Sequence, residues 1–212
     1  MAPAASHVPE EHIRQRHLDR LVMMSDGVFA IALTLSAVEL RPEFEAGKSF
    51  FDIWALPLGV YFMSFLLIAA VWVAHRRNLA HMSDVDGPST WLNLLLLSLV
   101  GLLPVVVRYF LTNLDNATHS GVVAYGAIVS ATYASLGLAW GYSSLVAGLA
   151  PALTRRRCFS WLAEYLFVAV IFLAMVLYTL GFTWAAVPVA AAGIGLRLVS
   201  LWLGRGEAPV RS

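Results

Sequence analysis

The chain has 212 residues, of which 59% are hydrophobic and 13% are charged, and its mean hydropathy is +0.74. Soluble domains carry about 25% charged residues, so this composition excludes a soluble domain and predicts an integral membrane protein. The formal net charge of +1 argues against a nucleic-acid partner, which would require a concentrated basic face. The one cysteine, Cys158, excludes an intrachain disulfide.

Six apolar segments lie between two polar ends. Residues 1–19 contain no apolar core that could act as a cleaved signal, so we expect a cytoplasmic tail there, with a second polar tail over 204–212. Each segment between them is long enough to cross a bilayer as a helix, which takes about 20 residues. The sequence therefore predicts an all-α, polytopic membrane protein with one transmembrane domain over residues 20–203. The six expected spans are 21–40, 53–75, 90–111, 121–148, 160–181 and 184–203.

The basic residues between the spans predict the orientation of the chain. If the N-terminus is inside, the outer segments carry only Arg41, Lys48 and Arg108. Cytoplasmic segments of membrane proteins carry an excess of Lys and Arg, so we expect both termini to be cytoplasmic. The inner segments would then hold Arg14, Arg16, Arg20, Arg76, Arg77, Arg155, Arg156, Arg157, Arg197, Arg205 and Arg211.

The first span contains a carboxylate, Asp26, about a turn and a half inside its start. An ionised side chain at membrane depth is costly unless it is paired or hydrated, so it marks a functional site by default. The alternative is that Asp26 lies at the headgroup boundary and is simply tolerated there. Position alone does not decide between these two interpretations.

Other polar side chains are expected at the depth of Asp26, on the cytoplasmic side of the first three spans. Polar groups in a helix bundle find one another, because hydrocarbon offers them no partner. Such a cluster either fixes the orientation of the first helix, which we favour, or forms a proton relay or ion site. His75 is the member expected to titrate near neutral pH, which leaves a pH-sensing contribution open. The members of this inner polar cluster are Arg20, Ser25, Asp26, Trp72, His75 and Asn93.

Beyond Asp26 the first span carries an apolar stripe. Ile31, Leu35 and Val38 recur at i, i+4 and i+7, and Thr34 lies beside them. By itself this pattern predicts ordinary packing in a helix bundle. A pore-lining role needs a further reason.

That reason comes from a resemblance to the transmembrane protein 175 family, the lysosomal potassium channel and its bacterial relatives. The first-helix signature of the family is Arg, three residues, Phe-Ser-Asp, three residues, Ala. Residues 20–30 follow it, except that Met24 stands in place of the Phe. Residues 72–75 (Trp-Val-Ala-His) and 91–95 (Trp-Leu-Asn-Leu-Leu) resemble the family as well. The length is similar to that of bacterial members with a single six-helix repeat.

The resemblance implies a potassium-selective or weakly selective cation channel. Family members with one repeat form homotetramers whose first helices line the pore, where bulky aliphatic side chains form the constriction. In this chain the constriction would fall at Ile31, with further rings at Leu35 and Val38. A hydroxyl ring at Thr34 is a second hypothesis, since it could replace part of an ion's hydration shell. The implied partners are potassium and other monovalent cations, the lipid of a bacterial inner membrane, and other copies of the chain.

A proton- or ion-coupled secondary transporter is the alternative function. Transporters usually contain internal repeats, broken helices and several charges at the midplane. Here the last three spans contain no second copy of the signature, and the membrane interior is nearly free of charge beyond Asp26 and Glu164. Both observations favour the channel. An enzyme is not expected, because the sequence has no metal-spaced cluster and no nucleophile motif, and no cofactor is implied.

Overall fold

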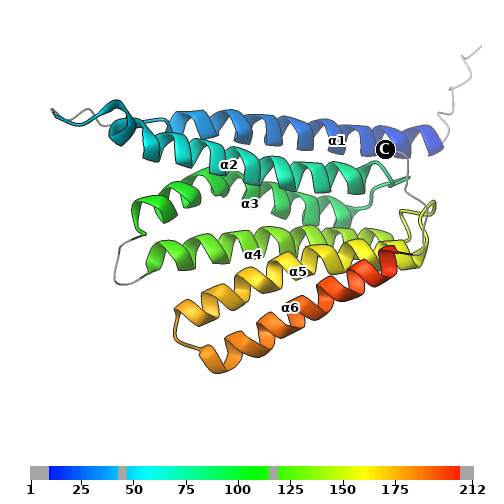
Figure 1. Ribbon diagram of the computed structural model, residues 1–212. Coiled ribbons are helices and arrows are strands. Elements are labelled where there is room, and N and C mark those ends of the chain that lie inside the picture. Colours follow the sequence, from blue (N-terminus) through cyan, green and yellow to red (C-terminus); the bar gives the residue numbers. More distant parts are fainter. Residues whose placement is uncertain (1–9, 43–46, 115–118, 206–212) are drawn as a thin grey trace, which may run out of the picture.

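The computed structural model describes residues 10–42, 47–114 and 119–205, which form a bundle of six long helices (Figure 1). All six are long and apolar enough to cross a membrane, so the predicted all-α fold with six spans is confirmed. The helices are α1 (Glu10–Leu35), α2 (Phe50–Leu79), α3 (Gly87–Thr112), α4 (Ser120–Gly141), α5 (Arg155–Thr179) and α6 (Thr183–Gly204). A 3-10 helix (Ser36–Glu39) continues α1, and a π-helix (Tyr142–Val146) continues α4.

Several helices extend beyond the apolar segments that the sequence marks. α1 begins at Glu10, inside the stretch expected to be a polar tail, and α5 begins five residues before its expected span at 160. Polar residues cap the starts of α2 and α5. Ser49 and Asp52 form a capping box at the start of α2, and the Thr154 side chain accepts a hydrogen bond from the backbone of Arg157 at the start of α5. Hydropathy locates the part of a helix that lies in lipid, whereas capping decides where the helix begins.

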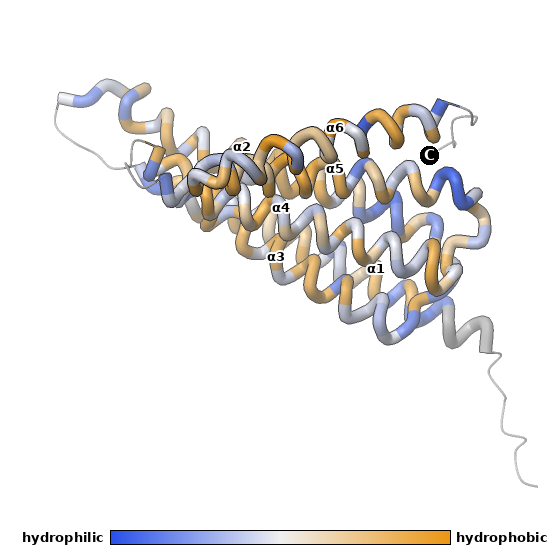
Figure 2. Tube along the Cα trace, turned by 90° about the horizontal axis from the view of Figure 1, so that it is seen from below, coloured by the Kyte–Doolittle hydropathy of each residue, from blue (hydrophilic) through white to orange (hydrophobic). Residues whose placement is uncertain are grey.

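Consecutive helices run antiparallel, so the start of α1 and the end of α6 lie at the same end of the bundle (Figure 1). This end, which we call the basic end, also carries the α2–α3 and α4–α5 connections, with Arg76, Arg77 and residues 155–157. Arg41 and Arg108 lie at the opposite end. Apolar residues are concentrated along the middle of the helices and hydrophilic residues near their ends (Figure 2). The basic end is therefore the one we expect to face the cytoplasm.

The helices are packed nearly in chain order. α1 contacts α2 and α3, α3 contacts α4, and α4 contacts α5, while α6 packs against α5. α1 and α6 consequently form opposite edges of the bundle (Figure 1). The core lies between them and is centred on α3. Its fully buried side chains include Ile68, Val71, Leu96, Val100 and Leu136.

Close contact between α4 and α5 depends on a glycine. A Cβ atom added at Gly126 would lie 2.7 Å from both Met175 Cε and Val176 Cγ2, which is closer than such atoms pack. Small residues allow helix backbones in membranes to approach closely, because hydrocarbon provides little other driving force for helix association. Gly195 in α6, by contrast, has open space around it.

We expect Gly126→Ala to destabilise the fold by about 1–3 kcal/mol, because the added methyl group overpacks the α4–α5 contact. Gly195→Ala is the matched control and should be neutral or stabilising by up to about 1 kcal/mol, since alanine is the better helix former. Thermal unfolding in detergent, followed by tryptophan fluorescence, measures both. Equal melting temperatures for the two variants would contradict this account of the contact.

Candidate functional site

A hydrogen bond between buried side chains ties α1 to α3. The Asn93 side-chain amide donates to Ser25 Oγ at 3.0 Å, and Ser25 Oγ donates to the backbone oxygen of Leu21 at 2.8 Å. Ser25 is fully buried and Asn93 is 4% exposed. The hydroxyl group therefore uses both its proton and a lone pair inside the protein. This bond fixes the distance between the two helices near the basic end.

A second bond ties α1 to α2. Trp72 Nε1 donates to Asp26 Oδ1 at 2.9 Å. The Arg76 guanidinium lies 5.3 Å from the centroid of the Trp72 ring, on the same helix one turn further on. A cation over an indole face is attracted by the ring quadrupole, so Arg76 helps to hold the ring in place. Asp26 thus has a specific hydrogen-bond donor. A carboxylate that was merely tolerated at the headgroup boundary would not need one.

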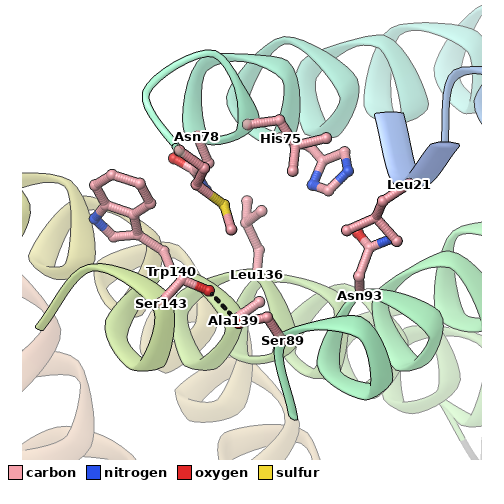
Figure 3. Close-up of a pocket in the computed structure, with 11 residues that line it drawn as sticks. Leu21, His75, Asn78, Ser89, Asn93, Leu136, Ala139, Trp140 and Ser143 are labelled. Carbon is pink, nitrogen blue, oxygen red and sulfur yellow. Dashed lines mark hydrogen bonds between the residues drawn. The ribbon is translucent and has the colours of Figure 1, made fainter. Parts of the chain in front are cut away.

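His75 lies next to these bonds without joining them. Its ring is 4% exposed and lies 5.5 Å, centroid to centroid, from the ring of Phe29 in α1. His75 and Asn93 line the same small cavity between α1, α2, α3 and α4, together with Leu21, Asn78, Ser89 and others (Figure 3). The cavity measures about 20 Å³, and His75 Nε2 and Asn93 Oδ1 have no hydrogen-bond partner in the described part of the chain. This volume is sufficient for one water molecule.

The structure does not bring Arg20 into contact with the other members of the inner polar cluster. Arg20 is exposed and lines a separate hollow with His17 and Asp86. The reason is geometric: six residues separate Arg20 from Asp26, and at about 100° per residue they lie about 120° apart around the helix. Residues at the same depth need not lie on the same face.

The start of α3, which positions Asn93, is fixed by Asp86. The Asp86 carboxylate caps the helix by accepting from the backbone of Ser89 at 2.9 Å, and it accepts from the Tyr142 hydroxyl at 2.8 Å. Partial desolvation acts to raise the pKa of Asp86, but the hydrogen bonds from Ser89 and Tyr142 outweigh it and hold this pKa below its ordinary value. Ser89 Oγ is also hydrogen-bonded to Ser143 Oγ at 2.9 Å (Figure 3). The described residues contain no group of three His, Cys, Asp or Glu side chains that could hold a metal ion.

The apolar stripe of α1 lies on the open edge of the bundle. Ile31 is 60% exposed, whereas Phe29 and Ala32 on the other side of the helix are 1% and 2% exposed. Leu35 and Val38 are also exposed. They are separated by the turn into the 3-10 helix, where side chains at i and i+3 eclipse, so Val38 follows Leu35 along one line. Thr34 is exposed, and its hydroxyl donates to the backbone oxygen of Ile31 at 2.8 Å.

A further polar network, which the sequence analysis missed, joins α2 to α5. Arg77 forms a salt bridge with Glu164 at 3.0 Å and donates to the Tyr165 hydroxyl at 2.8 Å. The Tyr165 hydroxyl donates to Asn78 Oδ1 at 2.7 Å. The guanidinium also lies 4.4 Å from the centroid of the Trp161 ring. The signal for this network was the isolated carboxylate of Glu164 in an apolar span, which requires a partner in the same way as Asp26 does.

Comparison with known proteins gives consistent results. The sequence profile of the endosomal/lysosomal potassium channel TMEM175 matches residues 20–104, the stretch that contains the whole inner polar cluster. A potassium channel of Streptomyces collinus is 28% identical over 206 residues, covering 90% of this chain and 93% of its own. A potassium channel of a Chryseobacterium species is 32% identical over 108 residues, 50% of this chain and 55% of its own. The rat endosomal/lysosomal proton channel TMEM175 is 29% identical over 108 residues, 49% of this chain and 21% of its own.

A solved structure has the same fold. The crystal structure of a lysosomal potassium-selective channel TMEM175 homologue from Chamaesiphon minutus superposes with a TM-score of 0.61 at 23% identity, covering 87% of this chain and 98% of its own. The fold and the site define a polytopic membrane protein with one six-helix repeat, in which polar side chains hold the first helix and leave its apolar stripe open. The sequence profile and the relatives show what that repeat is similar to: residues 20–104 match the TMEM175 family, and nearly the whole chain is similar to a bacterial potassium channel.

We expect the bond between Trp72 and Asp26 to stabilise the fold by about 1.5–3 kcal/mol, the usual range for a hydrogen bond to a charged group. Trp72→Phe, Asp26→Leu and the double variant form a mutant cycle that isolates this interaction. Thermal unfolding in detergent gives the coupling energy, and Trp91→Phe, at an exposed tryptophan of α3, is the control. A coupling energy near zero would show that the bond contributes nothing to the fold.

Proposed function

We propose that the chain is a passive channel for potassium and other monovalent cations in a bacterial cell membrane, and that it is potassium-selective or weakly selective. The match of residues 20–104 to the TMEM175 family supports this proposal, and so do the bacterial relatives named as potassium channels. The observation that carries it is the division of α1 into two faces. One face is buried, with Ser25 hydrogen-bonded to Asn93 of α3. The other face is exposed; it carries the apolar stripe and, nearer the basic end, Asp26, which is hydrogen-bonded to Trp72 of α2.

The composition of the exposed face favours contact with another protein helix over contact with lipid. Gly27, Ala30 and Thr34 lie on this face together with Ile31. A Cβ atom added at Gly27 would have nothing within 4 Å in the chain. Small residues at this spacing let helices in membranes approach one another closely. Copies of α1 could therefore pack against each other through this face.

We propose a homotetramer in which four copies of α1 surround the pore. Cyclic symmetry places four copies of each side chain around one axis. Ile31 would then form an apolar ring at the constriction, with Leu35 and Val38 forming rings toward the opposite end. A ring of apolar side chains can close a pore by dewetting and can discriminate between ions by diameter.

Thr34 supports a second hypothesis about selectivity. Its hydroxyl proton is directed to the backbone oxygen of Ile31, so its lone pairs are free to face an ion. Three residues separate Thr34 from Ile31, which places the two side chains about 60° apart around the helix and about one turn apart along it. A small rotation of α1 would exchange one for the other at the axis.

We expect Ile31→Asn to hydrate the constriction, raise the conductance and lower the permeability ratio of potassium to sodium. Ile194→Asn is the matched control, since Ile194 is 56% exposed on α6, at the edge of the bundle away from α1. Planar-bilayer recording under a potassium/sodium gradient gives the reversal potentials, and mass measurement in detergent shows whether the tetramer survives. Unchanged permeability ratios in Ile31→Asn would remove Ile31 from the pore.

Thr34→Ala separates the two selectivity hypotheses. If the aliphatic rings set selectivity, this variant should keep the permeability ratio of the wild type within about twofold, because the lost hydroxyl group is then not a ligand that selectivity depends on. A tenfold loss of selectivity would instead assign the filter to the hydroxyl ring. The same recordings test the transporter alternative, because saturating exchange tied to a co-substrate, without single-channel steps, would reject a channel.

A further inference from the structure

An apolar groove runs between α5 and α6 at the basic end of the bundle. It has a volume of about 380 Å³ and is lined almost entirely by hydrocarbon. Phe159 and Val199, one from each wall, are 49% and 48% exposed. The remaining wall residues include Leu162, Leu166, Leu196 and Leu203.

A single basic side chain, Arg156, lies at the mouth of this groove. Among the described residues that line the groove, Arg156 is the only polar one. Its guanidinium donates to the backbone oxygen of Trp202 at 3.1 Å and lies 5.1 Å from the centroid of the Trp202 ring. Arginine carries five N–H donors, so most of them stay available after this one bond. Arg155 and Arg205, both exposed, lie at the same end.

The groove is open in the tetramer proposed above as well as in the single chain. α6 packs against α5, at the edge of the bundle opposite α1 (Figure 1). If α1 surrounds the central axis, α5 and α6 lie at the rim. The groove then faces the bilayer, in the half where the basic residues of the chain gather.

We propose that this groove binds an anionic phospholipid, with one acyl chain between α5 and α6 and the headgroup phosphate on Arg156. Ten residues separate Arg156 from Leu166, which corresponds to about 15 Å of helix. This length equals the hydrocarbon depth of one leaflet, half of about 30 Å. Guanidinium groups bind phosphate through paired, charge-assisted hydrogen bonds, and basic pockets between helices at the cytoplasmic side are suited to anionic headgroups.

The test is native mass spectrometry of the full chain in detergent, titrated with dioleoylphosphatidylglycerol or dioleoylphosphatidylcholine. The wild type should bind the anionic lipid several-fold more tightly. Arg156→Gln should weaken its binding about tenfold, whereas Arg41→Gln, which removes the same charge at the opposite end, should leave it unchanged. Equal losses in the two variants, or none in Arg156→Gln, would overturn the proposal.

A second pair of variants tests the groove itself and keeps the test valid if Arg156→Gln fails to fold. Val199→Trp fills the groove and should weaken binding of both lipids, whereas Leu198→Trp, at the exposed neighbouring residue outside the groove, should not. A competition experiment separates the phosphate from the acyl chains, because glycerol 3-phosphate supplies the phosphate alone. Displacement of the lipid by this compound at equal concentration would indicate a simple anion site and reject the lipid. Loss of the oligomer in Val199→Trp would show that another copy of the chain occupies the groove. Neither result requires ion flux, so failure here leaves the channel proposal intact.

Discussion

A polar side chain inside a membrane must find its partner in the protein, because hydrocarbon offers none. In this chain that constraint is concentrated on two consecutive residues of α1. Ser25 is bound by Asn93 of α3, and Asp26 is bound by Trp72 of α2. Consecutive residues point about 100° apart around a helix. Two bonds in different directions, to two different helices, oppose rotation of α1 in either sense.

Fixing this rotation determines which face of α1 stays open. The open face includes Ile31, which lies five residues and about 140° from the exposed carboxylate of Asp26. Asp26 can therefore orient the stripe without lining the same path. A charge on the path would bind cations strongly, whereas an aliphatic ring acts through size and wetting. The arrangement separates the residues that hold the helix from those that would contact the ion.

The sequence predicts well how deep in the membrane each side chain lies, but it predicts poorly in which direction the side chain points from its helix. Span length and the pattern of loop arginines were enough to place Asp26, Trp72 and Asn93 at one level, because depth follows from counting residues along helices of known rise. Which of them bond depends on how each helix is rotated, and rotation is set by packing against all neighbours. Arg20 illustrates the difference, since it shares the depth of the inner polar cluster but points to another side. The start of α5 was missed for a further reason, because the Thr154 cap and not hydropathy defines it.

Glu164 is a second carboxylate in an apolar span, and its partners allow α2 to serve as a fixed support for α1. Trp72 on one side of α2 binds α1, while Arg77 on another side binds Glu164 and Tyr165 of α5. Five residues separate Trp72 from Arg77, so the two networks act within about 8 Å along the helix and about 140° apart around it. α2 is thus held from both sides at nearly one depth. Movement of α1 relative to the bundle then requires breaking its own two bonds, because the helix that carries one of them is itself anchored to the far half of the fold.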